Sequence, residues 1–360
     1  MKAAGHVPPF PGPEGGSLIF SHEVICHMPR KKKSPKIHWK QLLLSVIALV
    51  LACFILLLLN QAMGEQLPLP TAREVSAYLS GLLDELYGTA GIAPAPADVE
   101  GELVVHFLDV GQADCILIQT EEQNVLIDAG ETGCGEFINA YLDAQGVETL
   151  DLIIATHAHA DHIGSMSEVI EQFDVGKIIM SDIPAAIMPT SRTYETLLDT
   201  IASHGLHITR AVPGAEYSLG GGATLTILGP LEEYNDLNDT SVTCRVVYGE
   251  NAFLFTGDAE QEYEADLLKR YPKSRLAADV LKLGHHGSNT SSHADFLDTV
   301  GPEIAVAMVG LDNSYGHPHA ETLQALTERG ITLYRTDEDG TVVIASDGET
   351  LTVSTEKQAA

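Results

Sequence analysis

Three histidines and one aspartate crowd into the six residues from His157 to His162, within the segment THAHADH. The segment directly follows LDLIIA at 150–155, an apolar run that is typical of a buried strand. His157 and His159 are two residues apart, so their side chains point the same way on an extended segment. Asp161 and His162 follow where a helix would begin. Neutral imidazoles and carboxylates are preferred ligands of zinc-like cations, and four within six residues could serve two adjacent ions. The alternative is a polar loop in which the histidines are accidental.

Other candidate ligands share one placement, because each lies at the carboxyl end of an apolar run. The runs are NVLIDAG (124–130) with Asp128, AFLFTGD (252–258) with Asp258, and DVLKLGHH (279–286) with His285 and His286. Loops at strand ends are where a rigid sheet presents functional side chains. A lone GD or a lone HH is weak evidence, but all four segments together favour a metal site.

From residue 102 onward the pattern predicts a steady alternation of short strands and helices. Predicted strands cover 102–110, 115–120, 124–129, 150–156, 176–180, 223–229, 242–248, 252–257, 278–284, 303–309 and 331–335. Predicted helices cover 136–145, 163–173, 192–204, 260–271, 293–300 and 320–330. A β-rich stretch followed by a mixed one occurs twice, which predicts two sheet-plus-helix halves packed sheet to sheet with the helices outside.

The first 63 residues differ in charge from the rest of the chain. The 360 residues carry a formal net charge of −30, and the five cysteines show no CxxC spacing, which argues against a disulfide framework or a cysteine zinc site. Seven Lys or Arg and two acids lie in residues 1–63, which leaves 13 basic and 48 acidic residues for the remainder. A basic N-terminal part and a strongly acidic body suggest that the two see different environments.

The segment from Leu42 to Leu59 has eighteen residues with Ser45 as its single polar one, about the length that crosses a hydrocarbon core of ~30 Å. A buried core helix or a cleaved signal peptide is the alternative. The basic cluster before it predicts a cytoplasmic N-terminus and an outer body. We therefore expect a single-pass cell-membrane protein: a basic cytoplasmic tail (1–41), a transmembrane anchor (42–60), a linker with a short helix (61–101) and an extracytoplasmic domain (102–355). Whether Met1 or Met28 is the start stays open.

The motif HxHxDH, followed by GD and a strand-borne histidine, resembles the metallo-β-lactamase superfamily. A fuller set of segments is similar to the ComEC-like hydrolase domains and their free-standing relatives: FLDVGQADCILI (107–118), LNDTSVTCRV (237–246), LFTGDAE (254–260), DVLKLGHHGSNTSS (279–292) and DNSYGHPHAETL (312–323). The resemblance covers about residues 102–355. It implies an α/β (α+β) fold, a four-layer αββα sandwich, with a dinuclear metal site in the groove between the sheet edges.

The resemblance also implies roles for the candidate ligands. His157 and His159 would hold the first ion, Asp161 and His162 would hold the second, Asp258 would bridge both, and His285 would complete the second site. His286 is either a ligand or a neighbour that supports one. Asp128 would orient a ligand histidine from behind.

One departure from the superfamily pattern concerns a further histidine ligand that many members carry between HxHxDH and the bridging aspartate. Only His204 and His207 fall in that interval, inside an apparent helix-to-strand connection. The matching region is NDTS at 238–241, so the first ion is either held more weakly or held in part by Asn238 or Asp239. Ser241, Ser288 and His317 are further candidates for the surroundings of the metals or the substrate groove.

Two other motifs have both a structural and a functional interpretation. In DVGQAD (109–114), Asp109 and Asp114 either satisfy backbone amides of a strand-end turn or lie at the rim of the site. In YGHPH (315–319), a capped turn explains one histidine, while His319 is predicted to reach the groove as a proton donor or substrate contact.

The predicted chemistry is hydrolysis with two divalent ions, zinc or manganese. Such a pair lowers the pKa of bound water and clamps the oxygens of a displacement, so a metal-activated hydroxide would attack. Asp161 would align this nucleophile and His319 would serve the leaving oxygen. The resemblance favours a phosphodiester substrate, but the acidic body repels a polyanion, so a small phosphodiester is at least as plausible as long nucleic acid. Hydrolysis of a carbonyl substrate (ester, lactone or lactam) and a non-catalytic surface binding protein are the alternatives. No protein partner can be inferred.

Overall fold

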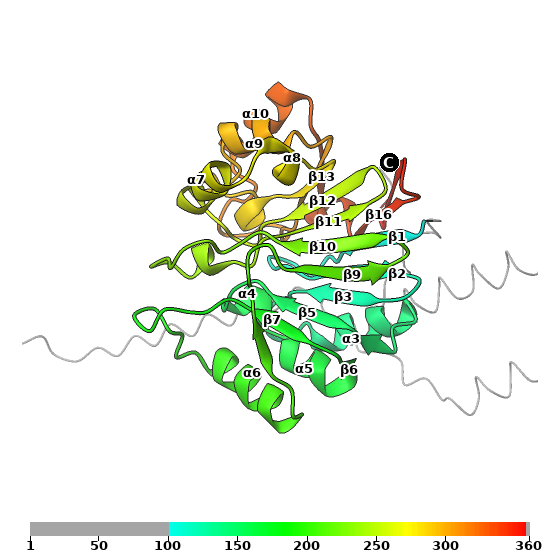
Figure 1. Cartoon of the computed structure of the whole chain (residues 1–360), viewed down its shortest axis with the longest axis vertical. Helices are drawn as coiled ribbons and strands as arrows, with labels where there is room; N and C mark the ends of the chain where they lie inside the picture. Colours follow the sequence, from blue (N-terminus) through cyan, green and yellow to red (C-terminus); the bar gives the residue numbers. More distant parts are fainter. Residues whose placement is uncertain (1–100, 358–360) are drawn as a thin grey trace, which may run out of the picture.

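The computed structural model describes residues 101–357, and two sheets packed face to face form its centre (Figure 1). The first sheet has eight strands in the order β17-β16-β1-β2-β3-β5-β7-β8. Its members are β1 (Leu103–Phe107), β2 (Ile116–Thr120), β3 (Asn124–Ile127), β5 (Leu152–Ala155), β7 (Ile178–Met180), β8 (Ile208–Arg210), β16 (Val342–Ser346) and β17 (Leu351–Thr355). Two-residue strands β4 (Thr149–Leu150) and β6 (Asp174–Val175) pair separately.

The second sheet has seven strands in the order β15-β14-β13-β12-β11-β10-β9. They are β9 (Glu216–Gly220), β10 (Ala223–Ile227), β11 (Cys244–Tyr248), β12 (Asn251–Phe255), β13 (Val280–Lys282), β14 (Ile304–Ala307) and β15 (Thr332–Arg335). Each sheet has a parallel part: β3, β5, β7 and β8 in the first, and β12 to β15 in the second. The carboxyl ends of parallel strands lie at one edge, so the loops that follow them meet there.

Helices cover the outer faces of both sheets (Figure 1). Over the first sheet lie α3 (Gly135–Ala144), α4 (Ala160–Ile163), α5 (Met166–Gln172) and α6 (Arg192–Ser203). Over the second lie α7 (Gln261–Arg270), α8 (Lys273–Leu276), α9 (Ala294–Val300) and α10 (Ala320–Arg329). A short α11 (Thr336–Asp339) and the 3-10 turns η1 (Asn238–Thr240) and η2 (Gly284–Gly287) complete the helical segments.

Alternation along the strands explains the four layers. In β5, Leu152 and Ile154 point into the core between the sheets, while Ile153 points to the helices outside. Side chains alternate between the two faces of a strand, so a strand that is covered on both faces needs apolar residues at successive positions. The expected αββα sandwich is therefore confirmed.

Several details differ from the prediction. The expected helix at 163–173 is two helices, α4 and α5, with Gly164 and Ser165 between them. Strands β8, β9, β16 and β17 were not expected, although β16 reads VVIAS and all five of its residues are buried. Because β16 pairs with β1, the end of the domain returns to the first sheet.

The predicted anchor at 42–60 and the segments around it lie outside the described residues. Within residues 101–357, no helix combines the length and the apolar character that a membrane span needs.

Candidate metal centre

The histidine-rich segment lies where the sequence placed it, between the end of β5 and the short helix α4. His157 and His162 are buried, and His159 and Asp161 are half-buried. His159 has extended backbone angles and is the residue before the first turn of α4. The chain therefore turns from strand to helix inside the motif, which presents several side chains to one place.

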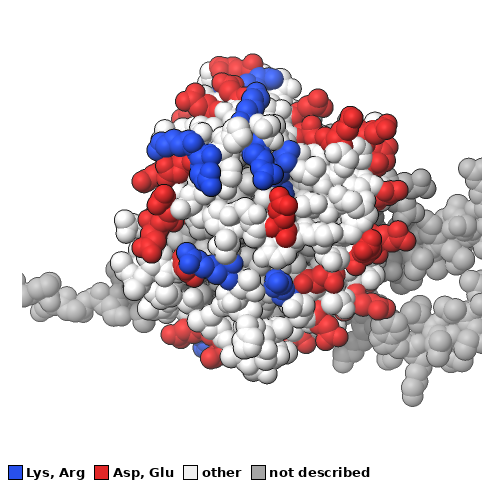
Figure 2. All heavy atoms as spheres, viewed as in Figure 1, with Lys and Arg blue, Asp and Glu red and all other residues white. Residues whose placement is uncertain are grey.

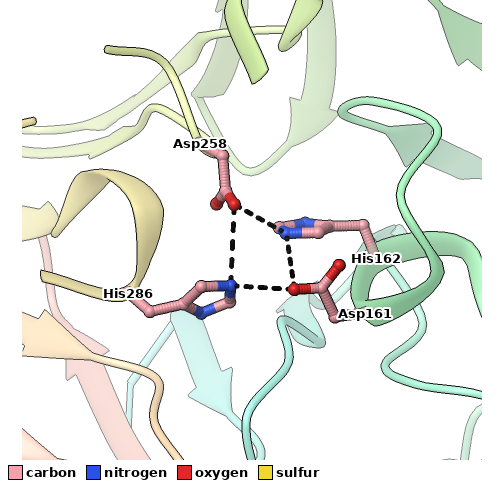
Figure 3. Close-up of side chains that lie close together, drawn as sticks. All are labelled: Asp161, His162, Asp258 and His286. Atoms are coloured by element: carbon pink, nitrogen blue, oxygen red, sulfur yellow. Dashed lines mark ion pairs between the residues drawn. The ribbon is translucent and has the colours of Figure 1, made fainter. Parts of the chain in front are cut away.

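Four side chains meet at the edge of the two sheets: Asp161, His162, Asp258 and His286 (Figure 3). Their nearest ligand-type atoms all lie within 4.8 Å of one another. The Oδ2 atom of Asp258 is 3.3 Å from Nε2 of His162 and 3.6 Å from Nε2 of His286. The second carboxylate, Asp161 Oδ2, is 3.4 Å from Nε2 of His286. The first sheet supplies two of these residues and the second sheet the other two.

Three buried atoms in this cluster have no hydrogen-bond partner among the described residues: Nε2 of His162, Nε2 of His286 and Oδ1 of Asp258. A buried polar atom left unpaired costs about 1–3 kcal/mol, so such atoms call for a partner. Two imidazole nitrogens and two carboxylates form a donor set that divalent transition metals favour. The residues present therefore fit the divalent cation that the sequence predicts.

The opposite ring nitrogens of the two histidines are held by protein groups. Nδ1 of His162 lies 2.7 Å from Oδ2 of Asp128, and Nδ1 of His286 donates to the Met308 carbonyl at 2.8 Å. Asp128 also accepts from the backbone N–H and the hydroxyl of Thr156. These contacts leave each Nε2 for the cluster, which is the arrangement that orients metal-binding imidazoles.

Electrostatics of the cluster are dominated by burial and by its carboxylates. Burial lowers the pKa of His162, but Asp258 and Asp128 together outweigh it and hold that pKa well above the usual value. Burial, together with His162, keeps the pKa of His157 well below its usual value. His157 therefore offers a neutral imidazole, and its Nε2 lies 2.9 Å from Nδ1 of His159 and 3.9 Å from Oδ2 of Asp258.

Comparison with known proteins agrees with this geometry. Residues 108–310 match the family described as the metallo-β-lactamase superfamily. The chain belongs to that superfamily. It is thus a hydrolase of this superfamily, and its cluster of Asp and His residues could bind metal ions. The two packed sheets agree with that membership.

Similar proteins include larger ones. The chain is 30% identical over 262 residues to ComE operon protein 3 of Bacillus subtilis, covering 68% of this chain and 33% of the relative. It is 35% identical over 243 residues to competence protein ComA of Neisseria gonorrhoeae, covering 67% and 32%. Recombination protein 2 of Haemophilus influenzae is 28% identical over 229 residues, covering 62% and 26%. The chain spans about a third or less of the length of each of these relatives.

His285 and His286 differ sharply in their surroundings. The His286 ring is buried and belongs to the four-residue cluster. The His285 ring is 25% exposed, and its Nδ1 lies 3.1 Å from Glu260 and 3.2 Å from the Thr290 hydroxyl. Its Nε2 is 3.8 Å from Oδ2 of Asp258. The superfamily pattern implied His285 as ligand, whereas the geometry favours His286.

The segment that replaces the missing superfamily histidine lies beside the cluster, in and after η1. Asn238 donates from Nδ2 to Glu260 at 3.3 Å, while its buried Oδ1 has no hydrogen-bond partner among the described residues. Asp239 accepts from the Glu260 backbone, and burial raises its pKa to about 6. Ser241 Oγ accepts from the Asp258 backbone at 3.0 Å and lies 3.4 Å from Nδ1 of His157. Ser241 therefore links two candidate ligands.

The loop YGHPH packs against the two histidines at 285 and 286. The His317 ring is 5.5 Å from the His285 ring and 6.2 Å from the His286 ring, between centroids. Burial, with His286 and His285 nearby, lowers the pKa of His317 to about 4. His319 instead accepts from the Asn289 backbone N–H at 2.9 Å through Nδ1, and its Nε2 is 3.2 Å from the Tyr315 carbonyl. His317 faces the candidate ligands, and both nitrogens of His319 contact loop backbone.

The remaining predicted groove residue, Ser288, is buried and supports the loop around it. Its hydroxyl is 3.0 Å from the Thr290 hydroxyl, and its carbonyl accepts from Thr322. The same neighbourhood contains Glu260, which the sequence reasoning missed. One of its oxygens contacts His285, Thr290 and Asn238, so it joins η1 to the loop that contains His285.

Sequence reasoning also missed Lys282, and it left Asp114 undecided between a turn and the rim. Both are 1% exposed, they form an ion pair, and they lie behind the candidate ligands. Burial lowers the pKa of Lys282, but Asp114 and Asp258 raise it by more. The lysine inside the apolar run DVLKLG was the sequence feature that could have predicted a buried, paired Lys282.

Asp109 is half-buried and contacts Lys357 and the Thr341 hydroxyl, away from the cluster residues.

Basic residues are few in the main body of the chain, with 13 Lys or Arg against 48 acids after residue 63. Figure 2 shows Lys and Arg side chains over α7 and α8, the region of the KRYPKSR segment at 269–275, on a face with many acidic side chains at its edges. Lys269 pairs with Asp266, and Arg275 lies 3.8 Å from Glu216. Acidic neighbours thus offset part of the positive charge of the segment 269–275.

Proposed function

We propose that this chain is a membrane-anchored, metal-dependent hydrolase that cleaves phosphodiester bonds. The observation that carries the proposal is the cluster of Asp161, His162, Asp258 and His286, in which Nε2 atoms that have no hydrogen-bond partner among the described residues face carboxylate oxygens. His157 and His159 adjoin it and would complete a second ion site through Asp258. When bound, two divalent ions would supply Lewis-acid activation of water and neutralise charge on a phosphoryl oxygen.

Different residues of the chain would hold the ions, align the water and assist the leaving oxygen. Asp258 is buried and faces four imidazoles, so it would hold the ions in place. Asp161 is 31% exposed at its side chain, so it can also meet the attacking water and align it. A histidine of YGHPH would hydrogen-bond or protonate the leaving oxygen. The sequence predicts His319 for this step, and the ring contacts of His317 make it the nearer candidate.

Substrate class is supported by two arguments. One relative is named a competence protein and another a recombination protein, and nucleic acid is the phosphodiester that such names favour. The acidic body would repel a long polyanion, although screening limits this effect to about 8 Å at physiological salt. A small phosphodiester or the end of a nucleic-acid strand is therefore the substrate we expect. Anchoring through 42–60, with the hydrolase domain outside the cytoplasm, belongs to the same proposal.

The test is metal analysis of the purified full-length chain with three assays: bis-p-nitrophenyl phosphate, a chromogenic lactam and single-stranded DNA. We expect close to two bound divalent ions and hydrolysis of phosphodiesters. The Asp258→Asn variant is the matched control, because it keeps the size of the side chain while removing its charge, and it should lose both metal and activity. Turnover of the lactam alone would favour the carbonyl alternative. Bound metal without any turnover would favour a binding protein.

A further inference from the structure

We propose that the buried ion pair between Lys282 and Asp114 is a positioning device for the metal centre. It would fix the rotation of Asp258 and hold the His286 ring, so both residues would act through other side chains rather than on the substrate. This inference rests on the proposed metal centre. It adds a role for two residues that lie inside the segments 107–118 and 279–292 but to which the resemblance gave no part in holding the metals.

Lys282 lies at the end of β13, on the face that points between the two sheets. Its neighbours Leu281 and Leu283 pack against the outer helices, whereas Val280, on the same face as Lys282, belongs to the core between the sheets. The side chain is 1% exposed, and lysines are almost never buried to this extent unless they are paired. Its ammonium contacts three oxygens: Asp114 Oδ2, the Gly257 carbonyl at 3.2 Å and Asp258 Oδ1 at 3.7 Å.

The two oxygens of Asp258 have different partners. Oδ1 faces the Lys282 ammonium. Oδ2 faces four imidazole nitrogens, the Nε2 atoms of His162 (3.3 Å), His286 (3.6 Å), His285 (3.8 Å) and His157 (3.9 Å). A carboxylate without a cation on one side could turn about its terminal bond, because that torsion is broad. Lys282 therefore favours one rotation of Asp258 and leaves the same oxygen toward the candidate ligands.

Asp114 contacts the candidate ligands from behind. Its Oδ1 is 3.3 Å from Nδ1 of His286, and its Oδ2 is 3.8 Å from Nδ1 of His162 as well as paired with Lys282. Its backbone N–H donates to the Asp161 carbonyl at 3.0 Å. One residue thus contacts three of the four members of the cluster. A pair that only stabilised the packing of the sheets would not need these contacts.

The experiment measures metal affinity of the full-length chain rather than activity alone. Lys282→Met, Asp114→Asn and the double variant are compared with wild type by titration with Zn²⁺ and, in parallel, Mn²⁺ against a chromogenic chelator. Each single variant leaves one buried charge unpaired, so its fold could suffer. The double variant removes both charges and keeps similar side-chain volumes. Lys177→Met, at an exposed lysine before β7, is the matched control. The Tm of the metal-free protein reports on the fold.

We expect metal affinity to fall 10–100-fold in the double variant while its metal-free Tm stays near that of wild type. The control should bind like wild type. Wild-type affinity in the double variant would overturn the positioning role and leave the proposed function intact. A wild-type chain that binds neither ion would overturn the metal centre and this inference with it.

Discussion

The assignment of the last ligand can be decided by comparing two adjacent residues, His285 and His286. We consider the substitutions His285→Asn and His286→Asn. Both residues have left-handed backbone angles, with φ of 48° and 55°, and asparagine tolerates this region better than most residues. Asparagine also keeps a donor near the position of Nδ1, so the hydrogen bond from residue 286 to the Met308 carbonyl can survive. Each change therefore removes mainly Nε2.

The expected magnitudes follow from the contacts of each Nε2. Nε2 of His286 is one of two imidazole nitrogens in the four-residue cluster and has no hydrogen-bond partner among the described residues. Loss of groups that only support ligands costs 10–100-fold in metal affinity, so loss of a ligand should exceed about 100-fold, or ~3 kcal/mol. His285 has its own partners in Glu260 and Thr290. Its replacement should therefore cost less than about 10-fold.

The assay is Zn²⁺ affinity by chelator competition, with the Tm of the metal-free proteins as a control for folding. A loss confined to His286→Asn supports the geometric assignment. The reverse result, with His285→Asn losing the metal and His286→Asn keeping it, would refute our reasoning and restore the assignment from the sequence. Equal large losses would mean that both rings contact an ion.

Three further predictions concern the leaving group, the core and the membrane. Of His317→Asn and His319→Asn, we expect the former to lower turnover by about 10²–10⁴ with metal content unchanged, and less on p-nitrophenyl esters, which need little protonation; a loss confined to His319→Asn would confirm the sequence assignment instead. Burial lowers the pKa of His106 from 6.5 to about 4. Between pH 4 and 6.5 the unfolded chain therefore binds this proton and the folded chain does not, so the free energy of unfolding should rise with pH across that range. In the metal-free protein, His106→Gln should flatten that rise by up to about 3 kcal/mol in urea unfolding, and an unchanged pH profile would contradict the burial argument. Protease added to intact cells should digest residues 101–357, and full protection, with permeabilised cells digested, would reverse the predicted orientation.

The sequence alone predicted the layered architecture and the segments whose histidines and aspartates meet at one edge of the sheets. Short apolar runs ending in His, Asp or Gly predicted strands whose carboxyl ends carry the site, because parallel strands bring these ends to one edge. THAHADH is local, so the strand-to-helix turn that gathers its side chains could be inferred before the fold was known. Strands β8, β9, β16 and β17 escaped prediction although β16 is apolar throughout.

The tertiary structure decided which neighbours act together. His285 and His286 are adjacent in a turn with positive φ, where neither strand nor helix periodicity says which ring points inward. Lys282 lies in β13 of the second sheet and Asp114 in the loop between β1 and β2 of the first, far apart in the sequence, and they meet only because the two sheets pack against each other. A strand pattern tells which face a side chain occupies. The partner of that side chain in the other sheet depends on how the two sheets are stacked, so only the tertiary structure determines it.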